Sequence, residues 1–226
     1  MALERARQKV VSVFAYRSVY LFAALLVLIV LVPFLEDSER GQIALNVINV
    51  LILFAAAVAV SDSRVCFALA VVLGASSLAF QAASFAPLES QLILASRAFG
   101  AAFYFLTVSY LLAYVLKREV LTLDKLYGAA AAFLMLGILW VYFYSFVLSF
   151  YPGALTAGGT PIVQAKISSE LLYFSFSVLS TTGFGDIVPV HAVARMLCVI
   201  EQVAGVLFIA ILIARLAGTL PPVERR

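Results

Sequence analysis

The chain has 226 residues, of which 65% are hydrophobic and 12% are charged, with a formal net charge of +3. This composition is too apolar for a soluble domain, so we read the sequence with the lipid bilayer as its solvent. The small net charge gives no reason to expect nucleic acid as a partner. Cys66 and Cys198 both fall in apolar segments and indicate no disulfide framework.

Apolar runs of membrane-spanning length dominate the chain. A transmembrane helix needs about 20 apolar residues. Residues 1–18 precede the first run, and their basic residues favour an amphipathic helix on the inner membrane surface, with a frayed tail as the alternative. The breaks between the first five runs are short, which predicts antiparallel neighbours. The six runs cover residues 19–35, 43–60, 65–85, 92–116, 126–150 and 194–216.

A long interruption separates the last two runs. It begins with a Gly/Pro/Thr-rich stretch, residues 151–167, which predicts a loop without regular structure. Residues 168–180 then favour a short helix, with Ser168 or Ser169 as its N-cap. This helix is too short to cross a bilayer. We therefore expect the chain to enter the membrane here and to return on the same side.

The distribution of Lys and Arg predicts the orientation, because cytoplasmic loops carry an excess of both. With the N-terminus inside, eleven of these residues lie near inner helix ends and three near outer ones. This asymmetry places the interruption outside and both termini in the cytoplasm. The inner set is Arg5, Arg7, Lys9, Arg17, Arg64, Lys117, Arg118, Lys125, Arg215, Arg225 and Arg226, and the outer set is Arg40, Lys166 and Arg195.

Residues 180–186 read STTGFGD and place two glycines, three hydroxyls and a carboxylate within this apolar chain. Non-helical backbone at membrane depth is tolerated only where protein buries it or where it lines a water-filled pathway. Gly183 and Gly185 adopt positive φ freely, which allows successive carbonyls to point to one side. Several copies around one axis would then stack rings of oxygens, with the Thr181 hydroxyl as an inner ring, and these rings can replace the hydration shell of a monovalent cation.

One loop per chain supplies one oxygen to each ring, so the sequence predicts assembly of several chains. Fourfold closure would give each ion eight oxygens from two adjacent rings. The preceding short helix would direct its partially negative C-terminal end toward the axis and favour a cation there. Asp186 would add negative charge at the outer mouth.

The motif TTGFGD resembles the T-x-G-[YF]-G-D signature of the potassium channel family, and its surroundings resemble that family over residues 168–216. Pro189 follows the motif and Gly205 lies in the middle of the last run, as in family members. The resemblance implies an all-α membrane protein with six transmembrane helices per subunit, a re-entrant pore helix and a selectivity-filter loop in a homotetramer. It implies a filter with K⁺ at Thr181, Thr182, Gly183 and Phe184, completed by Gly185, with Asp186 as outer anchor.

Residues around the filter differ from many family members. Phe184 stands where many relatives have Tyr, and Tyr173 is the expected partner of Asp186. Ser177 occupies a site where some relatives have Glu. Glu201 is an intramembrane carboxylate, expected to lie behind the filter and to contact Ser175 or Ser177. Helical spacing and the family resemblance together assign five residues to the inner cavity and gate. They are Gly205, Val206, Ile209, Ile213 and Ala217.

Voltage sensing is not expected. A sensor needs several regularly spaced arginines, whereas the fourth run has Arg97 alone. Arg97 is expected to snorkel outward or to pair with a polar group. His191, near the outer mouth, is interpreted as a solvated loop residue, with sensing of external pH as the alternative.

These observations predict a domain order and a function. We expect a potassium-selective channel of the plasma membrane that conducts passively, is no enzyme and has no cofactor, with K⁺ as permeant ion. Its partners are other copies of the chain and membrane lipids, with a separate regulatory subunit left open. The alternatives are a non-selective monovalent cation channel and a non-conducting, channel-like sensor or scaffold. The expected parts are a basic amphipathic segment at residues 1–18, a four-helix bundle at 19–116, a cytoplasmic linker at 117–125, a pore domain at 126–217 and a cytoplasmic tail at 218–226. Within the pore domain we expect an outer helix at 126–150, an extracellular loop at 151–167, a pore helix at 168–180, the filter at 181–186 and an inner helix at 194–217.

Overall fold

The computed structural model describes residues 17–36, 38–59, 63–83, 90–117, 122–163 and 168–217. Three of the segments expected from the sequence lie wholly or partly outside these described residues. The amphipathic segment 1–18 lies outside the described residues except for its last two. Residues 118–121 of the expected linker and the whole tail 218–226 also lie outside them.

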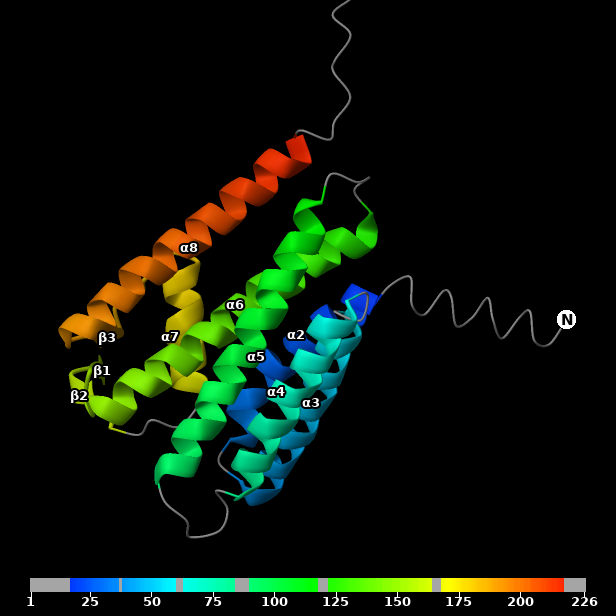
Figure 1. The fold of residues 1–226 in the computed structure, drawn as a ribbon. Coiled ribbons are helices and arrows are strands. Elements are labelled where there is room, and N and C mark those ends of the chain that lie inside the picture. The colour runs from blue at the N-terminus through cyan, green and yellow to red at the C-terminus, as the bar shows by residue number, and fades with distance from the viewer. Residues whose placement is uncertain are drawn as a thin grey trace, which may run out of the picture.

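Four helices fill the first half of the chain (Figure 1). They are α2 (Arg17–Leu35), α3 (Glu39–Ala59), α4 (Arg64–Ala83) and α5 (Ser90–Leu116). Helix α2 packs against α3 and α6, and α5 packs against α4 and α6. The bundle therefore shares a continuous apolar core with the second half of the chain.

The second half is organised around α6 (Leu123–Phe150), the most deeply buried of the long helices. It begins after Thr122, whose hydroxyl accepts a hydrogen bond from the amide of Lys125, and Asp124 lies in its first turn. Both features favour a helix start. Helices α7 (Ser169–Leu179) and α8 (Ala192–Ala217) pack against α6 and against each other.

Some of these helices are long enough to span a membrane. Among the described residues, four helices are long and apolar enough to cross a membrane. Helices α3 and α4 hold shorter apolar stretches, Ile43–Ala59 and Arg64–Ala79, so the count of six spans stays a prediction. The four segments are Ser18–Leu35, Leu94–Leu116, Leu123–Phe150 and Ala192–Arg215.

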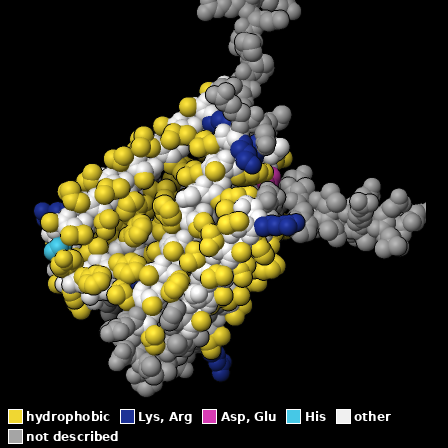
Figure 2. Space-filling model, viewed as in Figure 1, with side chains coloured by type: hydrophobic (Ala, Val, Ile, Leu, Met, Phe, Trp, Pro, Cys, Tyr) yellow, Lys and Arg dark blue, Asp and Glu magenta, His cyan; other side chains and the backbone are white. Residues whose placement is uncertain are grey.

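The surface agrees with a membrane environment. Figure 2 shows hydrophobic side chains spread over α8 and over the helices beside it. Val199, Ile200 and Val203 of α8 are half or more exposed. Apolar surface on this scale is stable only against lipid tails or against other protein chains.

Residues 151–163 contain regular structure that the sequence analysis did not foresee. Strands β1 (Leu155–Ala157) and β2 (Thr160–Pro161) form an antiparallel hairpin, and β3 (Ile187–Pro189) pairs with the other edge of β1. The expectation of a loop without regular structure is wrong here, and the fold is mostly rather than purely α-helical. Strands of two or three residues are too short to produce the alternating pattern that identifies a strand in a sequence.

Helix α2 is hydrogen-bonded at both ends to the second half of the chain. At its first turn, the Ser18 amide and hydroxyl donate to the two Asp124 oxygens at 2.9 and 3.0 Å, and the Tyr114 hydroxyl donates to the same carboxylate at 3.1 Å. Just beyond its last residue, Glu36 accepts hydrogen bonds from the backbone amide of Ser169, at 2.8 Å, and from its hydroxyl. The two contacts join α2 to the starts of α6 and α7.

Two residues singled out in the sequence have structural partners. Arg97 donates a hydrogen bond to the Ser149 hydroxyl and so joins α5 to α6, which confirms the expectation of a polar partner. His191 stacks on Tyr151 with 4.1 Å between ring centroids, and its Nδ1 accepts a hydrogen bond from the Val193 amide. His191 therefore packs at the end of α6 rather than standing free in solvent.

Candidate functional site

Helix α7 comes directly before the STTGFGD segment (residues 180–186). It begins after Ser168, whose hydroxyl accepts a hydrogen bond from the Leu171 amide at 3.4 Å, and Glu170 lies in its first turn. These groups favour helix initiation because the first amides of a helix lack intrahelical partners and carry partial positive charge. The helix ends at Leu179 after 11 residues. The predicted short helix is present, and of its two N-cap candidates, Ser168 and Ser169, it is Ser168 that caps it.

The backbone of the STTGFGD segment alternates between positive and negative φ. Thr181, Gly183 and Gly185 have φ of 59°, 55° and 82°, whereas Thr182 and Phe184 lie outside the positive range. Such an alternation allows successive carbonyl groups to point to the same side, whereas those of a regular strand point to alternate sides. The positive φ of both glycines was expected. The positive φ of Thr181 was not, because a β-branched residue rarely adopts it.

The start of the segment is held by the last turn of α7. The amides of Thr182 and Gly183 both donate to the Ser177 carbonyl, at 2.9 and 3.1 Å, and the Thr181 amide donates to the Val178 carbonyl at 2.9 Å. The last carbonyls of a helix have no intrahelical partner, so these bonds satisfy them. Ser177 therefore supports the segment through its backbone, while its hydroxyl bonds the Phe174 carbonyl.

The rest of the segment is open in the single chain. Residues 180–186 are exposed, and Phe184 is 68% exposed. A Cβ added at Gly183 or Gly185 would meet no atom within 4 Å. One chain therefore leaves the space beside these two glycines open.

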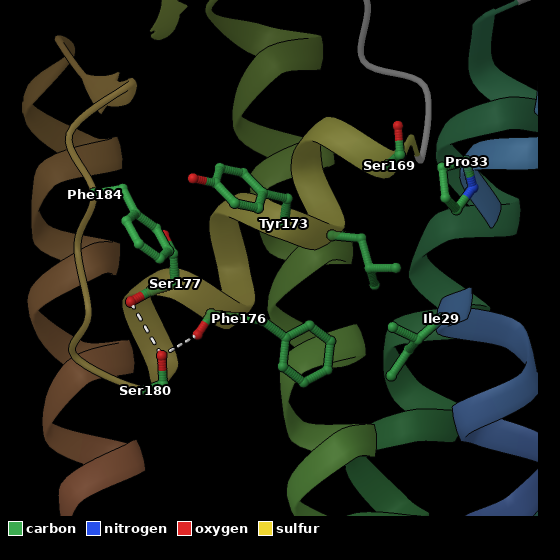
Figure 3. Close-up of a pocket in the computed structure, with 9 residues that line it drawn as sticks. Ile29, Pro33, Ser169, Tyr173, Phe176, Ser177, Ser180 and Phe184 are labelled. Carbon is green, nitrogen blue, oxygen red and sulfur yellow. Dashed lines mark hydrogen bonds between the residues drawn. The ribbon is translucent and has the colours of Figure 1, made fainter. Parts of the chain in front are cut away.

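Tyr173 connects α7 to the middle and the end of the segment. Its ring stacks on Phe184, with 5.9 Å between centroids and 13° between planes (Figure 3). Desolvation raises the pKa of the Tyr173 hydroxyl above its ordinary value, and the hydrogen bond and charge of Asp186 raise this pKa further. The structure thus brings together the pair that the sequence analysis expected, Tyr173 and Asp186.

An apolar cavity lies behind this stack. It has a volume of about 460 Å³ and is bordered by Ile29 and Pro33 of α2, by Phe176 and other residues of α7, and by Phe184 (Figure 3). The sequence analysis had no signal for it, because α2 and α7 are far apart in the chain.

The outer end of the segment is fixed by the small sheet. The Gly158 amide donates to the Asp186 carbonyl at 2.9 Å, and β3 then pairs with β1. The Val190 amide donates to the Ala154 carbonyl at 2.9 Å. The backbone on both sides of the segment is therefore attached to the chain's own secondary structure.

Glu201 lies behind α7, where it was expected. Its side chain is 0% exposed, and its Oε1 is 2.6 Å from the Ser175 hydroxyl. Its Oε2 accepts a hydrogen bond from the Tyr144 hydroxyl, which also contacts the Cys198 sulfur at 3.3 Å. Of the two serines proposed as partners, Ser175 makes the contact. Tyr144 was missed, because a tyrosine in an apolar run looks like an ordinary core residue.

The residues proposed for the inner cavity separate into two groups. Val206, Ile209, Ile213 and Ala217 are exposed on α8. Gly205 is buried instead, and a Cβ there would lie 2.1 Å from the Leu179 carbonyl oxygen. This glycine permits the close approach of α8 to the end of α7.

The atoms of the site that could coordinate a cation are backbone carbonyl and threonine hydroxyl oxygens. Within the part of the chain that the structure describes, no group of three or more His, Cys, Asp or Glu side chains could hold a metal ion. Backbone carbonyls and threonine hydroxyls suit a weakly bound monovalent cation.

Comparison with known proteins addresses the same part of the chain. Residues 130–220 match a protein-family model described as "Ion channel". Neither the curated proteins nor the solved structures give a match. The family match fits a non-enzymatic membrane protein and does not distinguish potassium from other cations. The matched residues hold α7, the STTGFGD segment and α8, so this part of the chain is similar to the ion channel family.

Proposed function

We propose that the chain is a potassium-selective channel whose pore is formed by four copies, each contributing one STTGFGD segment. The observation that carries the proposal is the alternating φ of Thr181, Thr182, Gly183, Phe184 and Gly185, combined with the open space in front of them. Four such lines around an axis would give stacked rings of oxygens that can replace the hydration shell of K⁺.

The surroundings support passive conduction. The C-terminal end of α7 leads directly into the segment and favours a cation near its carbonyls. Val206, Ile209 and Ile213 would line an apolar inner cavity from the exposed face of α8. Arg97 is hydrogen-bonded to Ser149, which supports a channel without strong voltage dependence. The distribution of Lys and Arg supports a location in the plasma membrane with both termini in the cytoplasm.

Ion flux into liposomes tests the proposal. The purified full-length chain is reconstituted, and uptake of K⁺ and of Na⁺ is measured separately under matched gradients. We expect K⁺ uptake that is blocked by barium, with no Na⁺ uptake. Equal uptake of both ions would instead identify a non-selective cation channel. Absence of flux across a range of pH and membrane tension would identify a non-conducting scaffold.

A matched pair of glycine variants ties the flux to the segment. Gly183 and Gly159 both have positive φ, 55° and 85°, and a Cβ added at either would meet no atom within 4 Å, so alanine imposes similar local strain at each. Gly183→Ala alters the proposed ion path, whereas Gly159→Ala alters the outer hairpin turn. We expect Gly183→Ala to abolish selective K⁺ flux and Gly159→Ala to preserve it. Equal loss in both variants would contradict the assignment of the ion path.

A further inference from the structure

Glu201 is the centre of a buried polar cluster that joins three helices. Tyr144 comes from α6, Ser175 from α7, and Glu201 and Cys198 from α8. Glu201 and Tyr144 are both 0% exposed. The cluster lies on the side of α7 that faces α6 and α8, whereas the residues of the STTGFGD segment are exposed.

Four polar contacts make up the cluster. The Ser175 hydroxyl oxygen is 2.8 Å from the Gly137 carbonyl oxygen and 2.6 Å from Glu201 Oε1. The Tyr144 hydroxyl contacts Glu201 Oε2 and is 3.3 Å from the Cys198 sulfur. Each contact joins two electronegative atoms and therefore requires one hydrogen between them.

The hydrogens available decide the ionisation state of Glu201. The Gly137 carbonyl and an ionised Glu201 only accept, so Ser175, Tyr144 and Cys198 bring three hydrogens to the four contacts. Tyr144 donates to Oε2, and the Cys198 thiol can donate to the Tyr144 oxygen. With Glu201 ionised, the single Ser175 hydrogen would have to serve both the Gly137 carbonyl and Oε1. A protonated Glu201 supplies the fourth hydrogen and satisfies all four contacts.

Burial favours the same state. An ionised carboxylate removed from water is strongly destabilised unless a cation compensates it. The groups that contact Glu201 are hydroxyls, and Tyr144 and Cys198 are the titratable side chains that face the cluster from α6 and α8. Helix α7 presents Ser175, which does not titrate. Neutral partners satisfy a carboxylic acid without leaving a net charge in the interior.

We propose that Glu201 is a neutral carboxylic acid that donates a hydrogen bond from Oε1 to the Ser175 hydroxyl. It is a positioning residue: through Ser175 it holds α7 against α6 and α8, behind the STTGFGD segment. The inference rests on the contacts within one chain and does not depend on which ion passes.

Infrared difference spectroscopy of the full-length chain in liposomes tests the proton directly. A protonated carboxylic acid has a carbonyl stretch distinct from that of a carboxylate. We expect the wild-type minus Glu201→Gln spectrum at neutral pH to contain this acid band, shifted in heavy water. The Ser175→Ala variant should move the band, because it removes the hydrogen-bond partner. A difference spectrum with carboxylate bands alone would overturn the proposal.

Thermal unfolding provides an independent readout. A glutamine amide donates and accepts like the protonated acid, so Glu201→Gln should keep a Tm near that of the wild type. Glu201→Ala should lower Tm markedly, whereas Gln202→Ala, on the exposed side of the same turn, should not. A Tm loss in Glu201→Gln as large as that in Glu201→Ala would contradict the proposal. If Glu201→Gln cannot be purified, the acid band of the wild type and its shift in Ser175→Ala decide the question.

Discussion

Glu36, one residue beyond the end of α2, binds the first residue of α7, Ser169, through both the amide and the hydroxyl of that residue. The two residues are 133 positions apart in the chain. A carboxylate at this place satisfies an amide that has no intrahelical partner and lies at the positive end of the helix dipole. The start of α7 is thus stabilised from outside its own sequence.

Glu36→Ala should therefore destabilise the start of α7. We expect a loss of about 1–2 kcal/mol in the free energy of unfolding, because a charged acceptor of a helix N-terminus is removed. Hydrogen–deuterium exchange of residues 169–172 should become faster. Glu170→Gln is the matched control, since Glu170 is exposed in the same first turn. If Glu170→Gln accelerated exchange as much as Glu36→Ala, net charge rather than the contact would be responsible.

Asp124→Ala should release the other end of α2. The carboxylate accepts two hydrogen bonds from Ser18 and one from Tyr114, and its residue is 7% exposed. Loss of an acceptor buried with its donors costs about 2 kcal/mol. Tyr114→Phe removes one of the three bonds and should cost about 1 kcal/mol. Thermal unfolding measures both, and equal Tm values for Asp124→Ala and the wild type would refute this account of α2.

Gly205→Ala and Gly74→Ala should have opposite effects on stability. A Cβ at Gly205 would lie 2.1 Å from a backbone oxygen, which cannot move without shifting α7. Overpacking of this kind costs about 1–3 kcal/mol. A Cβ at Gly74 would meet side chains at 3.6 Å, an ordinary contact, and alanine should stabilise α4 by up to about 1 kcal/mol. Unfolding of the two variants under identical conditions checks the sign, and stabilisation by Gly205→Ala would contradict the observed approach of α8 to α7.

Tyr173→Phe should loosen the outer end of the STTGFGD segment while keeping the ring stacked on Phe184. The variant removes the hydroxyl that interacts with Asp186, so amide exchange at Gly185 and Asp186 should increase. Tyr127→Phe is the control, because Tyr127 also contacts a phenylalanine ring, Phe22, but belongs to α6 rather than to α7. Unchanged exchange in Tyr173→Phe would show that the hydroxyl does not support the segment.

The same interaction has a defined dependence on pH. The Tyr173 pKa is raised above its ordinary value of 10.0, which means that the folded chain favours the neutral hydroxyl. The interaction is therefore at full strength below pH 10 and is lost as the pH rises through the raised folded pKa. The protection of the wild-type segment, measured as its amide exchange relative to that of an unstructured peptide at the same pH, should fall only in that alkaline range. Loss of this protection between pH 6 and 8 would contradict this assignment.

Features that depend on neighbouring residues were predictable from the sequence. The Ser168 cap and the positive φ of Gly183 and Gly185 follow from the local chemistry of serine and glycine. The contact of Glu201 with Ser175 was also foreseen, because an intramembrane carboxylate needs polar partners and α7 offers few.

Features that depend on distant segments could not be predicted. Nothing around Glu36 identifies Ser169 as its partner, since the contact exists only after α2 and α7 have packed together. Tyr144 lies in a uniformly apolar run, and its hydroxyl has Glu201 as a hydrogen-bond partner only because the fold brings the two residues together. The strands β1 and β3 are three residues each and acquire their structure by pairing across the chain.

The pairing of β1 with β3 also bears on how copies of the chain would associate. Residues 158–186, which include α7 and the STTGFGD segment, form a loop whose base is closed by backbone hydrogen bonds. Closing this loop within one chain removes part of its conformational entropy without any contact with a second copy. Association of four copies would then lose less entropy at the ion path, because each segment arrives with both ends already fixed. In the proposed tetramer, the pairing of β1 with β3 would thus prepare each chain for association.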